Sequence, residues 1–327
     1  MISENLLTEK RHSGCMRTGY VDRNRRFAVS AFGEPMAEFS SVGKDRYGLS
    51  FSGDAVNVAT SVARLGLKPC VISAAGDDHF GRALLEFMES QGISLSGMVT
   101  VKGGFTGLYF ISLGKNGAHE FTYYRKGSAA SAMLINRKQI EAIGASSIFH
   151  FSGIAQAISN ESKKAVSVAL DAAVRAGCFI SYDVNFRPAL WTKKDAAKAL
   201  ESVACKTDVM FISSEDYGMM YGKSSVSAAI DHLREMGVAN IIYKSGENGS
   251  IADFQGRRRI RQKVFRVKAV DATGAGDAFD AGFLSQYYRT GSEKDAMAFA
   301  SVNAALKCLK KGGTRGLPTF ESVMRKM

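Results

Sequence analysis

The chain contains the stretch Val270-Asp-Ala-Thr-Gly-Ala-Gly-Asp-Ala-Phe279, which follows a β-like segment over 264–267 and opens an amphipathic helix. Gly274 and Gly276, on either side of Ala275, let successive backbone amides converge on one point. The helix that starts beyond them adds the positive end of its dipole. The stretch therefore predicts an anion site of the kind that holds a phosphate group.

Asp277 lies in the first turn of that helix, where its charge would repel a bound phosphate. Its position is explained if it accepts the proton of a hydroxyl group that attacks phosphorus. The alternative is that it only complements the helix dipole. The stretch is not a Walker loop, since no Gly-Lys-Ser/Thr follows at the required spacing, and it lies too far from the first strand for a dinucleotide fingerprint.

Outward from this stretch, short apolar runs alternate with segments of helical period. Buried strands are predicted over 27–33, 70–75, 147–152, 178–185, 208–213 and 239–244. Helices are predicted over 54–65, 80–91, 161–176, 193–204 and 224–236. Such alternation predicts an α/β fold with a mostly parallel sheet covered on both faces, and ligands then bind at the carboxyl ends of the strands.

Two segments, 34–52 and 105–126, break this alternation because they are aromatic-rich and lack a helical partner. The second has two runs of alternating residues around a Gly114-Lys-Asn-Gly117 turn, which is typical of a β-hairpin. We expect both segments to form a small β-sheet that projects from the main sheet.

The composition limits the function classes. The 327 residues are 46% hydrophobic, which is enough for a large core. The net charge of +12 invites nucleic-acid binding, but the basic clusters lack interleaved aromatic residues, and the run 257–263 is expected on the solvated face of a hairpin. No apolar run is long enough to span a membrane. We expect neither a nucleic-acid nor a membrane partner.

The five cysteines are scattered without a Cys-x-x-Cys pair, and no histidine stands at zinc-site spacing. This pattern favours a reducing, cytoplasmic location, with Cys70 and Cys178 in the core. Residues 1–26 form a basic leader without an apolar signal region, and we expect it to be disordered or to reflect a mistaken start site.

Two distant motifs together resemble the ribokinase-like (pfkB) carbohydrate kinases. The stretch over 271–279 is similar to the C-terminal signature of that family, and Gly53-Asp-Ala-Val-Asn57 with the residues up to Gly66 resembles the N-terminal one. The resemblance implies a ribokinase-like three-layer sandwich over 27–327 with a β-sheet lid. Further segments, among them Tyr123-Tyr-Arg-Lys-Gly-Ser-Ala129 and Asp183-Val-Asn-Phe-Arg187, look most like 2-keto-3-deoxygluconate kinases.

The resemblance implies ATP-dependent phosphorylation of the primary hydroxyl of that sugar acid, with Mg²⁺. Asp277 would be the catalytic base, and the amides of Gly274, Ala275 and Gly276 would form the anion hole. The substrate-binding residues implied are Gly53, Asn57, Tyr109, Tyr123, Arg125, Ile154 and Arg187. Two arginines suit a carboxylate.

Alternative roles remain for several of these side chains. Arg125 and Arg187 could be members of structural ion pairs. Tyr109 and Tyr123 could belong to the lid core or to a dimer contact, and Asn57 could be a helix residue packed on the sheet.

The implied nucleotide-binding residues are Lys244, Gly246, Gly249, Thr273, Gly274, Gly276 and Asn303, of which Asn303 could equally face solvent.

The family's Asn-x-x-Glu motif is replaced here by Ser213-Ser-Glu-Asp216, so Asp216 and Glu215 are both candidate Mg²⁺ contacts. Asp271 and Thr273 match positions that bind a monovalent cation such as K⁺ in relatives. The family's Gly-Gly is replaced by Ser52-Gly53.

We therefore expect a sugar-acid kinase that dimerises through its lid. A kinase for a neutral sugar, such as a fructokinase or ribokinase, is the nearest alternative. A non-catalytic sugar-binding regulator is the alternative of another class.

Overall fold

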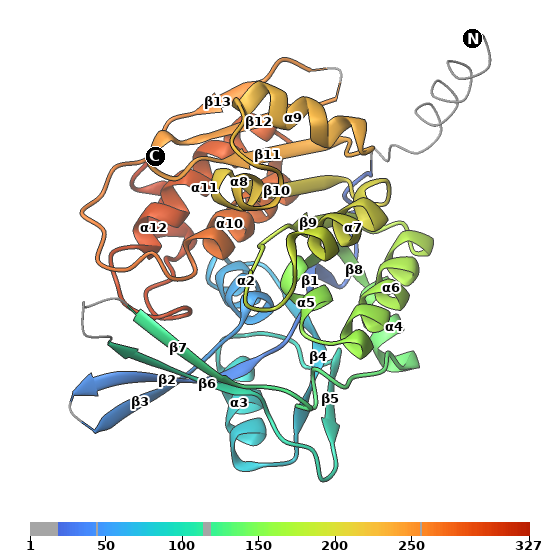
Figure 1. The fold of residues 1–327 in the computed structure, drawn as a ribbon, viewed down its shortest axis with the longest axis vertical. Helices are drawn as coiled ribbons and strands as arrows, with labels where there is room; N and C mark the ends of the chain where they lie inside the picture. Colours follow the sequence, from blue (N-terminus) through green and yellow to red (C-terminus); the bar gives the residue numbers. More distant parts are fainter. Residues whose placement is uncertain (1–18, 44, 114–118, 256) are drawn as a thin grey trace.

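The computed structural model describes residues 19–43, 45–113, 119–255 and 257–327, and within them the largest element is a nine-stranded sheet (Figure 1). In spatial order its strands are β13 (Ile260–Gln262), β12 (Ser250–Phe254), β11 (Asn240–Lys244), β10 (Val209–Ser213), β9 (Phe179–Asp183), β8 (Ser146–Ser152), β1 (Phe27–Phe32), β4 (Pro69–Gly76) and β5 (Met98–Val101). The strands from β11 to β5 pair in parallel, and β12 and β13 add an antiparallel edge. This confirms the predicted α/β fold.

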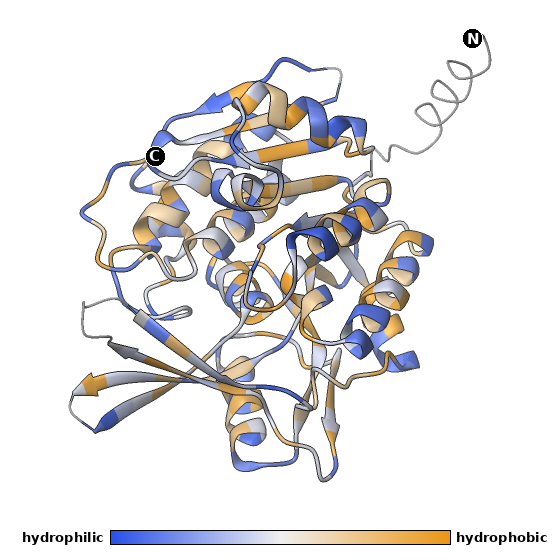
Figure 2. Ribbon diagram, in the orientation of Figure 1, coloured by the Kyte–Doolittle hydropathy of each residue, from blue (hydrophilic) through white to orange (hydrophobic). Residues whose placement is uncertain are grey.

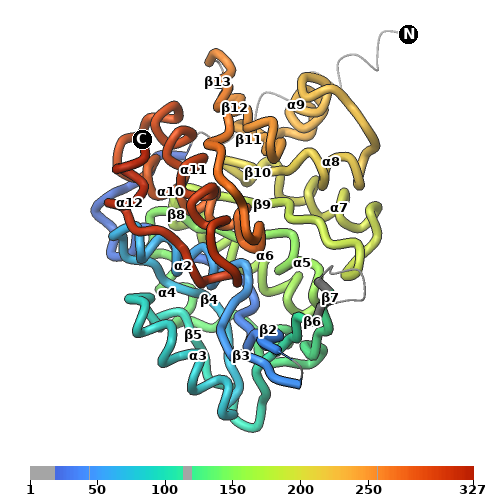
Figure 3. The backbone as a smooth tube through the Cα atoms, turned by 90° about the vertical axis from the view of Figure 1, so that its left-hand side faces the viewer, coloured from blue at the N-terminus to red at the C-terminus, as the bar shows by residue number. Residues whose placement is uncertain are grey.

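Helices cover both faces of the sheet. One layer consists of α2 (Asp54–Arg64), α3 (His79–Ser90), α10 (Ala275–Thr290) and α11 (Glu293–Lys307), and α12 (Phe320–Met324) packs on α11. The other layer consists of α4 (Arg137–Gly144), α5 (Gly153–Ala157), α6 (Asn160–Arg175), α7 (Lys193–Ala204), α8 (Ser214–Tyr221) and α9 (Val226–Glu235). Figure 3 shows α10 and α11 on one side of the sheet and α7, α8 and α9 on the other, and the two core clusters confirm the three-layer sandwich.

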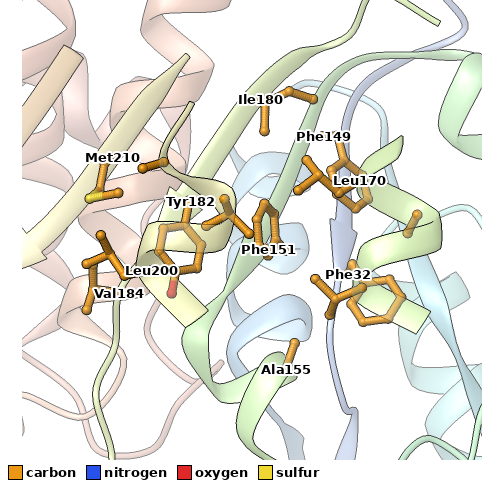
Figure 4. Packing of buried hydrophobic residues seen from close by; sticks show 14 of the residues in the cluster. Phe32, Phe149, Phe151, Ala155, Leu170, Ile180, Tyr182, Val184, Leu200 and Met210 are labelled. Atoms are coloured by element: carbon orange, nitrogen blue, oxygen red, sulfur yellow. The ribbon is translucent and has the colours of Figure 1, made fainter. Parts of the chain in front are cut away.

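The core lies in two slabs, one on each face of the sheet, because alternate residues of a strand point to opposite faces. In β8, Ile148 packs toward α2 and α10, whereas Phe149 and Phe151 pack toward α6 and α7. The Phe151 ring lies 5.7 Å from Phe149 and 4.9 Å from Tyr182 (Figure 4). The strands are accordingly apolar, and the outer helices alternate apolar and polar residues (Figure 2). Truncation of Phe151 to Ala would cost about 3–5 kcal/mol.

A second, smaller sheet projects from the edge of the sandwich (Figure 1). In spatial order its strands are β3 (Arg46–Ser52), β2 (Met36–Gly43), β6 (Leu108–Leu113) and β7 (His119–Tyr124). The central pair, β2 and β6, is parallel, and each outer strand is antiparallel to its neighbour. This sheet is the predicted lid. The predicted turn over 114–117 lies outside the described residues.

Most predicted elements match within two residues, but the segment over 264–267 is not a strand. It pairs with no strand in the part of the chain that the structure describes, and the Phe265 amide donates instead to Ser301 Oγ at 3.1 Å. The basic run over 257–263 does lie on the β12–β13 hairpin, where Arg257 pairs with Glu293. Cys70 and Cys178 are buried, as predicted.

The described part of the N-terminal leader is attached to the core. The Gly19 amide donates to Asp208 at 2.7 Å, and the Arg25 guanidinium donates to the Ser146 and Ala176 carbonyl oxygens at 3.0 and 2.6 Å. Residues 19–26 are thus joined to the sandwich by hydrogen bonds, and residues 1–18 lie outside the described range. Among the described helices, none combines the length and the apolar character that a membrane crossing requires.

Candidate active site

The glycine-rich stretch forms the N-terminus of α10, as the sequence predicts. Gly274 is the N-cap residue and is left-handed, with φ of 74°. A Cβ at this position would lie 3.1 Å from the Gly313 carbonyl oxygen, so both conformation and space favour glycine. The Ala275 amide already donates to Ala272 O at 3.0 Å, so its predicted place in the anion hole competes with a turn hydrogen bond.

Asp277 is held by Asn57 from a different helix. The Asn57 Nδ2 donates to Asp277 Oδ2 at 2.7 Å, and Asn57 Oδ1 accepts from Ser52 Oγ at 3.1 Å. Asn57 is buried, and both the nitrogen and the oxygen of its side-chain amide are engaged in these hydrogen bonds. It orients the carboxylate, whereas the sequence suggests a sugar contact or simple packing.

The electrostatic surroundings set the protonation of Asp277. Burial raises the pKa of Asp277 to about 6; the Asn57 hydrogen bond lowers it, and the charges of Asp54 and Asp183 raise it further. A carboxylate with a near-neutral pKa is suited to general-base catalysis.

The Lys244 ammonium group lies between two carboxylates in this site. Its Nζ is 3.2 Å from Asp183 Oδ1 at the end of β9 and 3.0 Å from Asp280 Oδ1 in α10. Burial lowers the pKa of Lys244, but the two carboxylates outweigh burial and raise it overall, whereas the pKa of Asp280 is raised by its own burial and by Asp183. The predicted nucleotide-binding lysine is thus an internal counter-ion for an acidic cluster.

Sequence reasoning missed Asp183 and Asp280 as members of the site. The available signals were that Asp183 stands at the carboxyl end of a predicted strand and that Asp280 follows Asp277 by one helical turn.

The N-terminus of α2 is the second glycine-dependent position. Gly53 has φ of 123°, and a Cβ there would lie 2.2 Å from the Glu34 carbonyl oxygen. The next residue, Asp54, accepts a hydrogen bond from Ser152 Oγ; burial raises the pKa of Asp54, and this hydrogen bond lowers it. Asp54 was also missed, although an acid directly after a positive-φ glycine at a helix start is a signal for it. The Ile154 amide, predicted to close the sugar site, donates to the same Ser152 Oγ at 3.2 Å.

Arg125 connects the lid to the sandwich through Glu34. The two side chains form an ion pair in which Arg125 is 12% and Glu34 1% exposed. Glu34 Oε1 also accepts from Ser128 Oγ at 2.6 Å. The Arg125 Nε is buried and has no hydrogen-bond partner within the described residues.

The two predicted tyrosines stack on each other but differ in exposure. Their ring centroids are 5.4 Å apart, and Tyr109 is buried with its hydroxyl donating to Glu38, whereas Tyr123 is 47% exposed. Burial raises the pKa of Tyr123, while the nearby charges of Arg125 and Arg187 lower it. The Arg125 guanidinium lies 5.5 Å from the centroid of this half-exposed ring, and the charge of Arg187 acts on the same tyrosine.

The predicted nucleotide residues fall into two groups. Gly246 has φ of 54° with open space around it, and Gly249 has φ of 84° at a position where a Cβ would lie 2.2 Å from Gln262 O. Both lie in the turn after β11, near Lys244. Asn303 is fully buried, and its Nδ2 donates to Ala278 O at 2.7 Å, so it neither faces solvent nor is accessible to a nucleotide in this conformation.

The candidate metal residues are already engaged with backbone amides. Asp216 Oδ1 accepts from the Phe186 amide at 3.1 Å, and Glu215 is exposed. Asp271 accepts from Thr273 and Gly312 amides at 2.9 Å each; burial raises the pKa of Asp271, but these hydrogen bonds outweigh it and lower the pKa. In the described part of the chain, His, Cys, Asp and Glu side chains form no cluster of three or more that could hold a metal ion.

A carboxylate of near-neutral pKa beside a glycine-rich helix N-terminus, in a three-layer sandwich with a lid sheet, defines a phosphotransferase that acts on a hydroxyl group. Comparison with known proteins shows which family the chain belongs to. The chain belongs to the pfkB family of carbohydrate kinases, whose family model matches residues 23–320.

Two relatives show how far this similarity extends. The 2-dehydro-3-deoxygluconokinase of Thermoproteus tenax is 30% identical over 89% of this chain and 91% of its own length. Fructokinase-1 of Oryza sativa subsp. japonica is also 30% identical, over 84% and 87%. A solved fructokinase with bound ATP from Xylella fastidiosa superposes with a TM-score of 0.82 at 23% identity, covering 91% of this chain and 97% of that one. The protein is therefore a sugar kinase of ribokinase-like fold, and relatives with different substrates are equally similar to it.

Proposed function

We propose that this protein phosphorylates the primary hydroxyl of a sugar acid, 2-keto-3-deoxygluconate, with ATP to give the 6-phosphate. The observation that carries the choice of an acid is Arg125, whose guanidinium lies 5.5 Å from the centroid of the Tyr123 ring, with the charge of Arg187 acting on the same tyrosine. Guanidinium groups bind carboxylates through charge-assisted hydrogen bonds. The similarity to the Thermoproteus tenax enzyme supports the same substrate.

The reaction is an in-line transfer of the γ-phosphoryl group. The substrate hydroxyl oxygen forms a bond to the γ-phosphorus as the bond from that phosphorus to the bridging oxygen of ADP breaks, and the hydroxyl proton passes to Asp277. The Asn57 hydrogen bond holds Asp277 in position, and the amides at the start of α10 face the developing negative charge. Closure of the lid would exclude water from the transfer.

Mg²⁺ would be held chiefly by the ATP phosphates. The acidic groups Asp183, Asp216 and Asp280 offer the one or two carboxylate contacts, direct or through water, that such an ion uses. When bound, Mg²⁺ would neutralise phosphate charge. Lys244 already neutralises part of the acidic cluster, so the ion would enter a site whose remaining charge is negative.

A neutral-sugar kinase is the second candidate, and one observation favours it. Glu34 pairs with Arg125 and neutralises much of its charge, which reduces the need for an acidic substrate. The equal similarity to a fructokinase is consistent with this reading.

The deciding experiment measures ADP release with Mg-ATP over a panel of sugars and sugar acids. We expect 2-keto-3-deoxygluconate to give the highest kcat/KM, and Arg187→Ala to raise its KM roughly 10- to 100-fold, since a charge-assisted hydrogen bond contributes about 1.5–3 kcal/mol. Arg137→Ala, an exposed arginine far from the lid, is the control. Fructose as the best substrate, with an unchanged KM in Arg187→Ala, would overturn the sugar-acid proposal.

Catalysis is separated from mere sugar binding by Asp277→Asn. We expect kcat to fall at least 100-fold while sugar and ATP affinities measured by calorimetry change little. Turnover close to that of the wild type would exclude Asp277 as the base, and absence of turnover in the wild type with intact binding would favour a sugar-binding regulator.

We also propose that two copies pair through their lids. The strands β3 and β7 are the edges of the lid sheet, and Tyr47, Leu49, Phe121 and Tyr124 are exposed large apolar side chains on these strands. Analytical ultracentrifugation should show a dimer that dissociates in Leu49→Asp. A monomeric wild type at micromolar concentration would contradict the pairing.

A further inference from the structure

Lys307, the last residue of α11, is one of the largest fully buried side chains, with 0% exposure. Its Nζ approaches two backbone carbonyl oxygens, Asp271 O at 3.5 Å and Lys310 O at 3.4 Å. A buried lysine is costly unless its charge is compensated, so this position requires an explanation.

Part of the compensation comes from the loop that precedes the anion hole. Burial lowers the pKa of Lys307 below its usual value, and the negative charge of Asp271 opposes that shift only in part. Asp271 in turn binds the Thr273 amide with one carboxylate oxygen and the Gly312 amide with the other. Lys307 and Asp271 thus tie the segment 271–273 to the segment 310–312.

Both segments lead directly into the site. Gly274 follows the first, Gly313 follows the second, and a Cβ on Gly274 would be only 3.1 Å from Gly313 O. A Cβ on Gly313 would lie 2.4 Å from Ser52 Oγ, the group that donates to Asn57. Movement of either segment would therefore disturb both the anion hole and the support of Asp277.

Backbone carbonyl oxygens around an acidic loop are the ligands that suit a monovalent cation such as K⁺, and an ammonium group uses the same acceptors. We propose that Lys307 is a built-in cation that takes the place of a monovalent metal ion at the Asp271 loop and positions the anion hole, so that activity needs no K⁺. The proposal rests on the kinase activity proposed above.

The first test is a K⁺ titration of the wild-type enzyme. Tetramethylammonium chloride keeps the ionic strength constant while K⁺ rises from zero to about 100 mM. We expect kcat to change less than twofold. A tenfold or larger activation by K⁺ would overturn the proposal.

The second test uses two variants of Lys307. In Lys307→Ala the cation is lost and space is left, so we expect kcat to fall about tenfold or more and to recover with K⁺ or ethylammonium. In Lys307→Met the side-chain volume is kept without charge, so a similar loss should not recover. Lys311→Ala, which removes an exposed lysine from the same segment, is the matched control and should behave as the wild type. Equal behaviour of all variants, without rescue, would contradict a positioning role.

Melting temperature supplies a readout that does not require the proposed substrate. K⁺ should raise the melting temperature of Lys307→Ala by several degrees and leave the wild type unchanged, because only the variant has a site to fill. If no sugar is phosphorylated by the wild type, the proposed function fails and this shift still decides the inference. If the variants do not fold, the K⁺ titration of the wild type decides it.

Discussion

Asn57 Nδ2 donates to Asp277 Oδ2 at 2.7 Å, although 220 positions separate the two residues in the chain. The contact joins the first turns of α2 and α10, the two helices that begin at the glycine-dependent positions Gly53 and Gly274. It makes the conformation and the pKa of Asp277, the proposed base, depend on both motifs at once.

The activity should therefore show an acidic limb set by Asp277. Its pKa of about 6 means that kcat/KM rises with pH through about 6, as the carboxylate forms. Asn57→Ala removes a hydrogen bond that stabilises the charged form, so the limb should move to higher pH. A pH profile of kcat/KM from 4.5 to 9 measures this; an unmoved or downward-shifted limb would refute the assignment.

The same pKa has a consequence for stability. Because the folded-state pKa of Asp277, about 6, lies above the unfolded value of 3.8, the native state prefers the protonated carboxyl and loses stability as pH rises between these values. Asp277→Asn should therefore raise the free energy of unfolding by about 2–3 kcal/mol at pH 7.5 and by little at pH 3.5. Urea denaturation at both pH values tests the sign, and a gain confined to the lower pH would contradict it.

Lys244→Met should be strongly destabilising. Asp183 and Asp280 would then face each other without their shared cation, and breaking a buried ion pair costs about 3–5 kcal/mol. The acidic limb of activity should also move upward, because Lys244 lowers the pKa of Asp277. Lys206→Met, which removes a half-exposed pair with Asp171, is the control and should cost less than about 1 kcal/mol.

Glu34→Gln tests the connection between lid and sandwich. The variant keeps a polar side chain for Ser128 but leaves the Arg125 guanidinium buried without its partner, so we expect a loss of about 3 kcal/mol. The exposed pair of Glu141 and Arg137 provides the comparison, and Glu141→Gln should change stability by less than about 0.5 kcal/mol. Similar unfolding midpoints for the two variants would show that the buried pair contributes little.

Gly53→Ala separates steric exclusion from backbone strain. Gly53 and Gly92 both have positive φ, of 123° and 77°, but an added Cβ at Gly53 would overlap the Glu34 carbonyl, whereas nothing lies within 4 Å at Gly92. Gly92→Ala should cost about 1 kcal/mol and leave activity unchanged. Gly53→Ala should cost more and reduce kcat, because α2 carries Asn57; equal costs in thermal denaturation would contradict this.

Much of the fold was predictable because its signals are local. Apolar runs such as 70–75 and 208–213 became central strands, and the glycines at 53 and 274 stand where the backbone adopts positive φ. The β-like sequence of 264–267 does not form a strand, because β propensity alone does not provide a partner strand to pair with. Asp183, Asp280 and Asp54 were missed because their local signals, a place at a strand end or near a helix start, do not by themselves distinguish a site residue from any other acid.

The sequence by itself determined the α/β sandwich with its lid and the position of the proposed base, Asp277, at the glycine-rich helix start, because periodicity and glycine spacing are properties of neighbouring residues. Only the tertiary structure decided how the polar groups are paired. In the folded chain, Lys244 pairs with Asp183 and Asp280, Arg125 pairs with Glu34, and Lys307 contacts the Asp271 loop. Such pairings depend on burial and on which carboxyl ends of strands meet, and these are set by packing across more than 30 residues of chain.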